Sequence, residues 1–334
     1  MKRGVYITVD VECSMGGAWG DDALRPVPPS RAMMGEYGDR RLGVPRITEI
    51  LGRYGLAATF FVETFAEEQG HPGQTEPVCR HLLDAGQDVQ LHIHPNHKHY
   101  GLHRSGLPYP FTDSMAELPP EKQRELLEEG AERLATWTGA RPVAFRAGNM
   151  AASQETLKAL SDVGIRIDSS YAFPYAGGPC RLSPDDPYNG SRWYGDVLEL
   201  ALSGFYQPRL PGLHPTKPLD LVGISFEECR DAVTRICSAG ADAVVILHSF
   251  SLFKVRNLPY DGGRPDRIVA RRFRRLCEWL AGAADRWPTY TFVQLAEAIA
   301  DNRYEAKAVA PPRLGGGRAL VRKAVQAVNN LYWV

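Results

Sequence analysis

Short runs of apolar, often β-branched residues alternate along this chain with longer segments in which apolar residues recur every three or four positions. The runs predict buried strands, and the recurring segments predict helices that pack on them by one face. Strands are predicted at 4–12, 57–62, 88–94, 142–148, 165–171, 197–201, 242–249 and 289–293. Helices are predicted at 45–54, around 78–83, and at 119–138, 153–163, 226–238 and 266–283. Strand and helix alternate about seven times, which is typical of parallel βαβ units and predicts an α/β fold.

Three long segments rich in glycine and proline interrupt this alternation, at 14–44, 100–118 and 172–220. Loops of this length inside a compact domain are more often functional than idle. With 334 residues and 44% hydrophobic composition, the chain can bury a large core. We therefore expect one barrel domain over 1–300, followed by a linker and a C-terminal amphipathic helix over 301–334.

The charge and the cysteine content narrow the class of protein. Lys plus Arg equals Asp plus Glu at 39 each, whereas a general nucleic-acid binder should be strongly basic. Six cysteines are scattered without close pairing, which fits reduced thiols better than a disulfide framework. The first apolar run is broken by acids too soon for a signal peptide, and no later run is long enough to span a bilayer. These features predict a cytoplasmic protein that does not bind nucleic acid.

Polar residues suited to catalysis stand at the C-terminal ends of the predicted strands. Asp10 and Glu12 close the first strand and share a face by the two-residue period. Two acids on one face of an otherwise apolar strand are costly to bury without a cation or a proton. Arg146, Asp168 and His248 close later strands. In an α/β barrel this is the rim on which the active site is built, so we expect these side chains to gather there.

Four of the nine histidines fall between residues 92 and 99. On a strand His92 and His94 face the same way, and Pro95 then ends the strand, so that His97 can turn back toward them. Neutral imidazoles suit zinc, cobalt, nickel or iron, and such a site usually includes a carboxylate. A polar surface loop that is merely rich in histidine is the alternative. We expect a metal site.

Five short motifs, in order, resemble those of the polysaccharide deacetylase family, carbohydrate esterase family four. They are T-V-D-V-E at 8–12, H-I-H-P-N-H at 92–97, F-R-A-G-N at 145–149, I-D-S-S-Y at 167–171 and V-I-L-H-S at 245–249. Each motif alone is weakly specific, whereas five in the right order are fairly specific. The resemblance covers roughly residues 4–297 and implies a distorted (β/α)7 barrel.

The resemblance also implies a role for each polar residue. Asp10 would act as the general base, held ionised by Arg146, and His248 would act as the general acid. Asp168 would lie near the first pair or near His248 as an orienting partner. Glu12 and two of the histidines would hold a divalent metal ion, expected to be zinc.

The sequence departs from the family pattern at the metal ligands. The family normally spaces its two metal histidines four residues apart, but that position is Asn96 here. The pair is therefore His92 with His94 or His92 with His97. Glu12 also stands where aspartate is commoner, which gives the carboxylate a longer reach to the ion.

These inferences predict a metal-dependent hydrolase of carbohydrate metabolism that removes an N-acetyl group from an amino sugar or a glycoconjugate precursor. The partner is then an N-acetylated sugar substrate. One alternative is a cyclic amide hydrolase of the allantoinase type, which has a similar first motif. Another is a non-catalytic carbohydrate-binding barrel, against which the retention of both acids, the histidines, Arg146 and His248 argues.

The C-terminal segment after P-P-R-L-G-G-G is predicted to be a helix with one apolar stripe. The stripe consists of Leu320, Val321, Ala324, Val325, Val328, Leu331 and Tyr332. Arg318, Arg322 and Lys323 give the helix a basic side, and Tyr332 and Trp333 end it. Two interpretations stay open: a helix packed on its own barrel, or a peripheral contact of the C-terminal helix with an anionic membrane or a partner.

Overall fold

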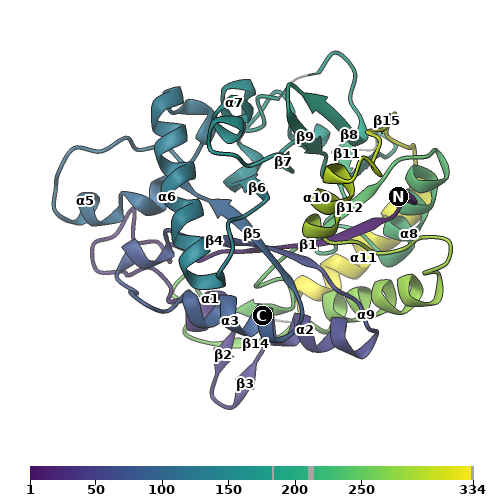
Figure 1. Ribbon diagram of the computed structural model, residues 1–334. Coiled ribbons are helices and arrows are strands. Elements are labelled where there is room, and N and C mark those ends of the chain that lie inside the picture. The colour runs from purple at the N-terminus through teal and green to yellow at the C-terminus, as the bar shows by residue number, and fades with distance from the viewer. Residues whose placement is uncertain (183, 210–213, 332–334) are drawn as a thin grey trace.

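A curled sheet of nine strands forms the centre of the molecule, in a computed structural model that describes residues 1–182, 184–209 and 214–331 (Figure 1). Seven strands are parallel, in the order β12 (Ala243–His248), β1 (Val5–Val11), β4 (Thr59–Glu63), β5 (Asp88–Ile93), β6 (Ala144–Ala147), β7 (Ile167–Asp168) and β9 (Val197–Leu200). Antiparallel β8 (Asn189–Tyr194) and β15 (Ala308–Val309) extend the β9 edge. This is the α/β architecture that the alternating pattern predicts.

The two ends of the parallel series come together through connecting loops. The amide of Ser203 donates to the carbonyl of Val244 at 3.2 Å, and the amide of Ile246 donates to the carbonyl of Leu219 at 3.0 Å. Backbone from the segment after β9 therefore bonds to β12, and the sheet curls into an incomplete, distorted barrel instead of lying open.

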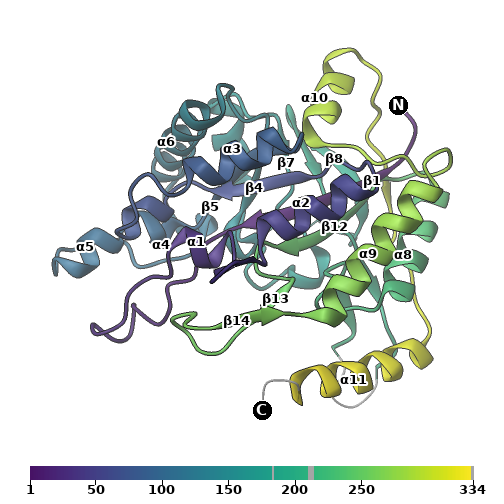
Figure 2. The ribbon, with the colours of Figure 1, turned by 90° about the horizontal axis from the view of Figure 1, so that it is seen from below.

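Helices cover the outside of this barrel (Figures 1 and 2). The longer ones are α2 (Val44–Arg53), α3 (Glu76–Asp84), α6 (Pro120–Thr138), α7 (Gln154–Asp162), α8 (Phe226–Ser238), α9 (Arg267–Gly282), α10 (Phe292–Ala300) and α11 (Gly316–Leu331). Three short ones are α1 (Pro29–Ala32), α4 (Pro95–Lys98) and α5 (Tyr100–Arg104). Two-stranded ribbons pair β2 (Glu36–Tyr37) with β3 (Arg40–Arg41), β10 (Gly204–Tyr206) with β11 (Thr216–Pro218), and β13 (Phe253–Val255) with β14 (Gly263–Pro265).

The period of the strands decides which side chains enter the barrel. In β1, Val5, Ile7 and Val9 belong to the large core under the helices. Tyr6 belongs instead to a separate cluster inside the barrel, together with Phe61 of β4. Successive residues of a strand point to opposite faces, so the even-numbered residues that follow Tyr6 along β1 also point inward.

The predicted strand at 289–293 is wrong. Thr289 makes a single bridge to Val5, and α10 begins three residues later. The hydroxyl of Thr291 accepts a hydrogen bond from the amide of Gln294, and the Gln294 side chain accepts one from the amide of Thr291. This reciprocal capping satisfies amides at the start of a helix and outweighs the strand preference of the residues around it.

The C-terminal helix α11 crosses α8 and α9 (Figure 2). Arg322, predicted on the exposed basic side, is instead buried, where it pairs with Glu228 of α8 and donates to Gln207 at 2.8 Å. Leu320 and Val321, predicted in the packed stripe, are 58% and 65% exposed.

An ion pair to the barrel thus sets the orientation of α11, which the apolar pattern alone could not give. Tyr332, Trp333 and the side chains of Val328 and Leu331 lie outside the described residues. Among the helices that the structure describes, none is both long and apolar enough to cross a bilayer. The division of the chain at residue 300 stays a prediction.

Candidate active site

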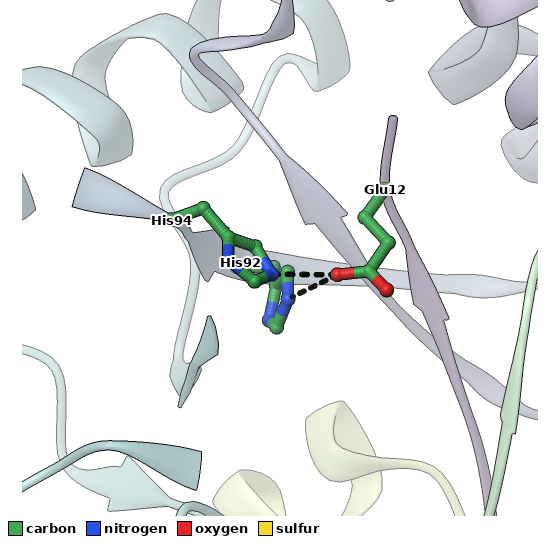
Figure 3. A group of neighbouring side chains, drawn as sticks. All are labelled: Glu12, His92 and His94. Carbon is green, nitrogen blue, oxygen red and sulfur yellow. Dashed lines mark hydrogen bonds and ion pairs between the residues drawn. The ribbon is translucent and has the colours of Figure 1, made fainter. Parts of the chain in front are cut away.

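Glu12, His92 and His94 meet at the C-terminal rim of the barrel, where β1 and β5 end (Figure 3). One ligand atom from each residue lies within 4.8 Å of the others. Glu12 Oε2 is 2.6 Å from His94 Nε2 and 3.5 Å from His92 Nε2. Both histidines therefore direct the same ring nitrogen at one carboxylate oxygen.

The hydrogen bonds on the far side of each ring fix the tautomers. His92 Nδ1 lies 2.9 Å from the carbonyl oxygen of Arg146, which can only accept, so Nδ1 carries the proton. His94 Nδ1 lies 2.9 Å from Asp113 Oδ2 and is protonated for the same reason. In the neutral rings the Nε2 lone pairs then point toward Glu12. Hydrogen bonds of this kind, from the ring nitrogen that faces away from the metal, orient metal-binding histidines.

The charged side chains of the cluster shift each other's pKa. Burial disfavours the charge of Glu12, but the neighbouring histidines, His94 foremost, outweigh burial and hold the Glu12 pKa well below its ordinary value. Burial likewise opposes charge on His94, yet Glu12 and Asp113 raise its pKa well above the ordinary value. His92 Nε2 is buried without a hydrogen-bond partner among the described residues. A divalent ion would use all three ligand atoms, and one carboxylate with two imidazoles suits zinc.

His97 is excluded from this cluster. Its ring stacks on His94 with centroids 5.0 Å apart, and its Nδ1 faces Glu63 Oε2 at 3.7 Å. Burial lowers the His97 pKa to about 3. Of the two pairs that the sequence leaves open, the structure brings together His92 and His94. The prediction of His97 as a ligand is corrected because Pro95 begins α4, which carries His97 behind His94.

Asp10 and Arg146 form a buried ion pair inside the barrel. Arg146 is fully buried and donates to Asp10 Oδ1 at 2.6 Å. It also donates to Thr8 Oγ1 at 2.9 Å and to the carbonyl and hydroxyl of Ser169 at 3.0 Å. Its guanidinium lies 4.3 Å from the ring centroid of Phe61. With so many contacts, Arg146 holds one oxygen of Asp10 in a fixed position, and the sequence predicted this pairing.

His248 ends β12 on the other side of Glu12. Its Nε2 is 3.8 Å from Glu12 Oε1, its side chain is 28% exposed, and its ring stacks on Phe250. A pocket of about 280 Å³ opens beside these groups and is lined by Asp10, Glu12, His92, Asn149, Met150, Tyr175, Pro179, Leu202, Asp220, Ile246 and His248. The pocket places the carboxylates of Asp10 and Glu12 and the rings of His92 and His248 around one small volume.

Asp168 does not join them, and its predicted contacts are wrong. Ile167 belongs to the cluster inside the barrel, so Asp168 points to the opposite face, where it pairs in register with Glu199. Asp168 Oδ1 accepts a hydrogen bond from the hydroxyl of Ser170 at 2.7 Å. Burial, followed by the charge of Asp168, raises the Glu199 pKa well above its ordinary value. Within the described part of the chain, no hydrogen bond joins Asp168 to Arg146 or His248.

The sequence reasoning missed four residues of the site. Asp113 orients His94, and the side-chain amide of Asn149 donates to Asp113 at 2.7 Å. Asp220 lines the pocket near His248, and burial raises its pKa although the charge of His248 opposes the rise. Glu63 accepts hydrogen bonds from the amides of Phe65 and His94.

Only Glu63 could have been found, because it ends a buried strand as Asp10 and Glu12 do. Asp113 and Asp220 lie in long segments without periodicity, so no pattern indicates their position. The side chain of Asn149 is positioned by a left-handed backbone with φ of 56°.

Comparison with known proteins agrees with this architecture. Residues 34–167 match the polysaccharide deacetylase family. A peptidoglycan deacetylase-like protein of Gibberella zeae is 26% identical over 176 residues, which cover 51% of this chain and 44% of that protein. The chain thus spans less than half of that relative. A crystal structure of a candidate polysaccharide deacetylase from Mycobacterium smegmatis has the same fold, with a TM-score of 0.56, 20% identity, and coverage of 93% of this chain and 94% of that one.

Proposed function

We propose that this chain, whose residues 34–167 match the polysaccharide deacetylase family, hydrolyses the N-acetyl group of an amino sugar or of a glycoconjugate precursor. One observation supports this proposal above the others. Asp10, Glu12, His92 and His248 line one pocket of about 280 Å³ at the barrel rim, with His94 beside Glu12 and Arg146 beside Asp10. Amide hydrolysis needs a base, an acid and a site for the developing oxyanion within a few ångströms of one carbonyl carbon.

Glu12, His92 and His94 would hold the metal ion, which we propose to be zinc. A bound divalent ion lowers the pKa of a water toward ~7 and polarises the acetyl carbonyl. Asp113 supports the site from behind, because its carboxylate fixes the ring of His94.

Asp10 would take the proton of the attacking water. Arg146 occupies Asp10 Oδ1 and places an opposite charge 2.6 Å from it. The other carboxylate oxygen is then the one that can accept the proton in the pocket that Asp10 lines.

His248 would deliver a proton to the nitrogen of the leaving amine as the carbon–nitrogen bond breaks and acetate forms. Its side chain is 28% exposed, so it can exchange protons with solvent. Asp220 lines the same pocket and can stabilise the charged imidazole.

The test is acetate release from N-acetylated amino sugars by the purified full chain. Protein stripped with a chelator and reloaded with zinc should release acetate, whereas Asp10→Asn reloaded in the same way should not. A ureide serves as the control substrate for cyclic amide hydrolysis. Ureide hydrolysis without acetate release, or acetate release at an equal rate by Asp10→Asn, would overturn the proposal.

A further inference from the structure

A second cavity, of about 760 Å³, lies outside the barrel between α8, α9 and α11. It shares no residue with the rim pocket. Helix α11 lies across the first turns of α8 and α9, because Arg318 donates to the carbonyl of Glu227 and Asn329 donates to Asp266 (Figure 2). The groove therefore exists only because the C-terminal segment folds back on the barrel.

Helix α9 directs a row of arginines into this groove. Arg267, Arg271 and Arg274 follow one another at intervals of four and three residues and so lie along one face of the helix. In the described part of the chain none of the three has an acidic partner. This sets them apart from Arg275, which pairs with Glu227 at 2.6 Å on the same helix.

The other cations of the groove already have partners, and Arg272 donates to the carbonyls of Leu221 and Val222. Arg318 pairs with Asp231, and Arg322 pairs with Glu228. The row on α9 consequently carries a net positive charge in a chain whose overall formal charge is zero.

The position of this row is unfavourable for the isolated helix. Like charges one turn apart repel each other, and cations in the first turn oppose the helix dipole. Arg267 is the first residue of α9, and no acidic residue lies in that turn. Asp266 caps the helix, but its Oδ1 already accepts the amides of Ile268 and Val269. A bound anion would relieve the repulsion and also use the positive end of the helix.

The groove is apolar as well as basic. Ile268, Val321 and Val325 line it, and Val321 is 65% exposed. Phe226 forms part of the floor, beneath the Arg275 guanidinium, which lies 4.3 Å from its ring centroid. A small inorganic anion would leave this apolar surface in water, whereas a hydrocarbon group attached to the anion would cover it.

We propose that the groove binds one phosphorylated amphiphile per chain. Its phosphate would lie among Arg267, Arg271 and Arg274, whose planar guanidinium groups match phosphate oxygens in pairs. Its hydrocarbon would run along Ile268, Val321 and Val325. Binding does not depend on the proposed deacetylase activity, since the groove and the rim pocket have no residue in common.

The test is calorimetric titration of the full chain with dodecyl phosphate below its micelle concentration. The double variant Arg271→Gln/Arg274→Gln should weaken binding by more than about tenfold, because it removes two charge-assisted contacts. Arg235→Gln is the matched control, since Arg235 is exposed near the far end of α8 and lies outside the groove. Circular dichroism should show both variants folded.

Dodecyl maltoside tests the need for charge, and inorganic phosphate tests the need for the hydrocarbon. Much weaker binding of both would support the proposal. Binding of dodecyl maltoside or of inorganic phosphate as tight as that of dodecyl phosphate would overturn the proposal. Undiminished binding of dodecyl phosphate by the double variant would also overturn it. Binding to anionic vesicles without binding of dodecyl phosphate would also overturn it, because that result indicates attraction to a charged surface and not occupation of the groove.

Discussion

Replacing Arg146 with methionine removes a charge from the interior of the barrel while preserving most of the side-chain volume. The wild-type guanidinium is fully buried and makes hydrogen bonds to Asp10, Thr8 and Ser169. Asp10 is itself only 1% exposed. Arg146→Met would therefore leave a carboxylate buried without its counter-ion.

The loss of stability in Arg146→Met can be estimated from this uncompensated charge. Removing one partner of a buried ion pair destabilises a protein by roughly 3–5 kcal/mol, because the remaining charge stays desolvated. Adding Asp10→Asn removes the charge, so the double variant should recover much of the loss. In contrast, Arg141→Met breaks an ion pair with Glu128 that is 3.0 Å long and in which both side chains are about half exposed. This variant should lower the free energy of unfolding by less than about 1 kcal/mol.

Urea unfolding of the wild type, the three variants and Asp10→Asn alone gives the coupling free energy directly. The reasoning requires Arg146→Met to be the least stable of the set and the double variant to be more stable than Arg146→Met. If the double variant were as unstable as Arg146→Met, the lost hydrogen bonds to Thr8 and Ser169 would be the main cause. The account of Arg146 as the counter-ion of Asp10 would then be refuted.

Three further predictions concern the metal site. His92→Ala should abolish zinc binding measured by elemental analysis, whereas His97→Ala should keep it, because His92 directs a ring nitrogen at Glu12 and His97 faces Glu63 instead; full metal content in His92→Ala contradicts the assignment. Asp10→Asn should keep the metal and lower turnover by about 10²-fold or more, whereas Glu12→Gln should lose the metal; the reverse result would exchange their roles. Asp113→Ala should weaken zinc affinity by roughly 10–100-fold in a competition titration with a chelator, since it frees the His94 ring, and an unchanged affinity would remove Asp113 from the site.

Local patterns in the sequence were enough to predict most elements and the inward-facing acids. The apolar run of β1 and its two-residue period place Asp10 and Glu12 together at the barrel rim, and the predicted helix at 226–238 coincides with α8. Ser225 and Glu228 cap that helix reciprocally, which is an interaction between near neighbours in the chain. Such features can be predicted because the residues that decide them lie within a few positions of one another.

Contacts between distant segments decided the rest. Asp113 reaches His94 from a loop without periodicity, and its role depends on where that loop folds. Arg322 is buried because it pairs with Glu228 of another helix, although the helical pattern predicted it on the exposed side.

Helix α4 begins at Pro95 and places the His97 ring against His94 with Nδ1 facing Glu63, and the inward position of Ile167 turns Asp168 away from the site. Both positions depend on how each strand sits against its neighbours. A strand carries the period of its side chains in its own sequence, but which face becomes the interior is set when the sheet curls and the helices pack on it.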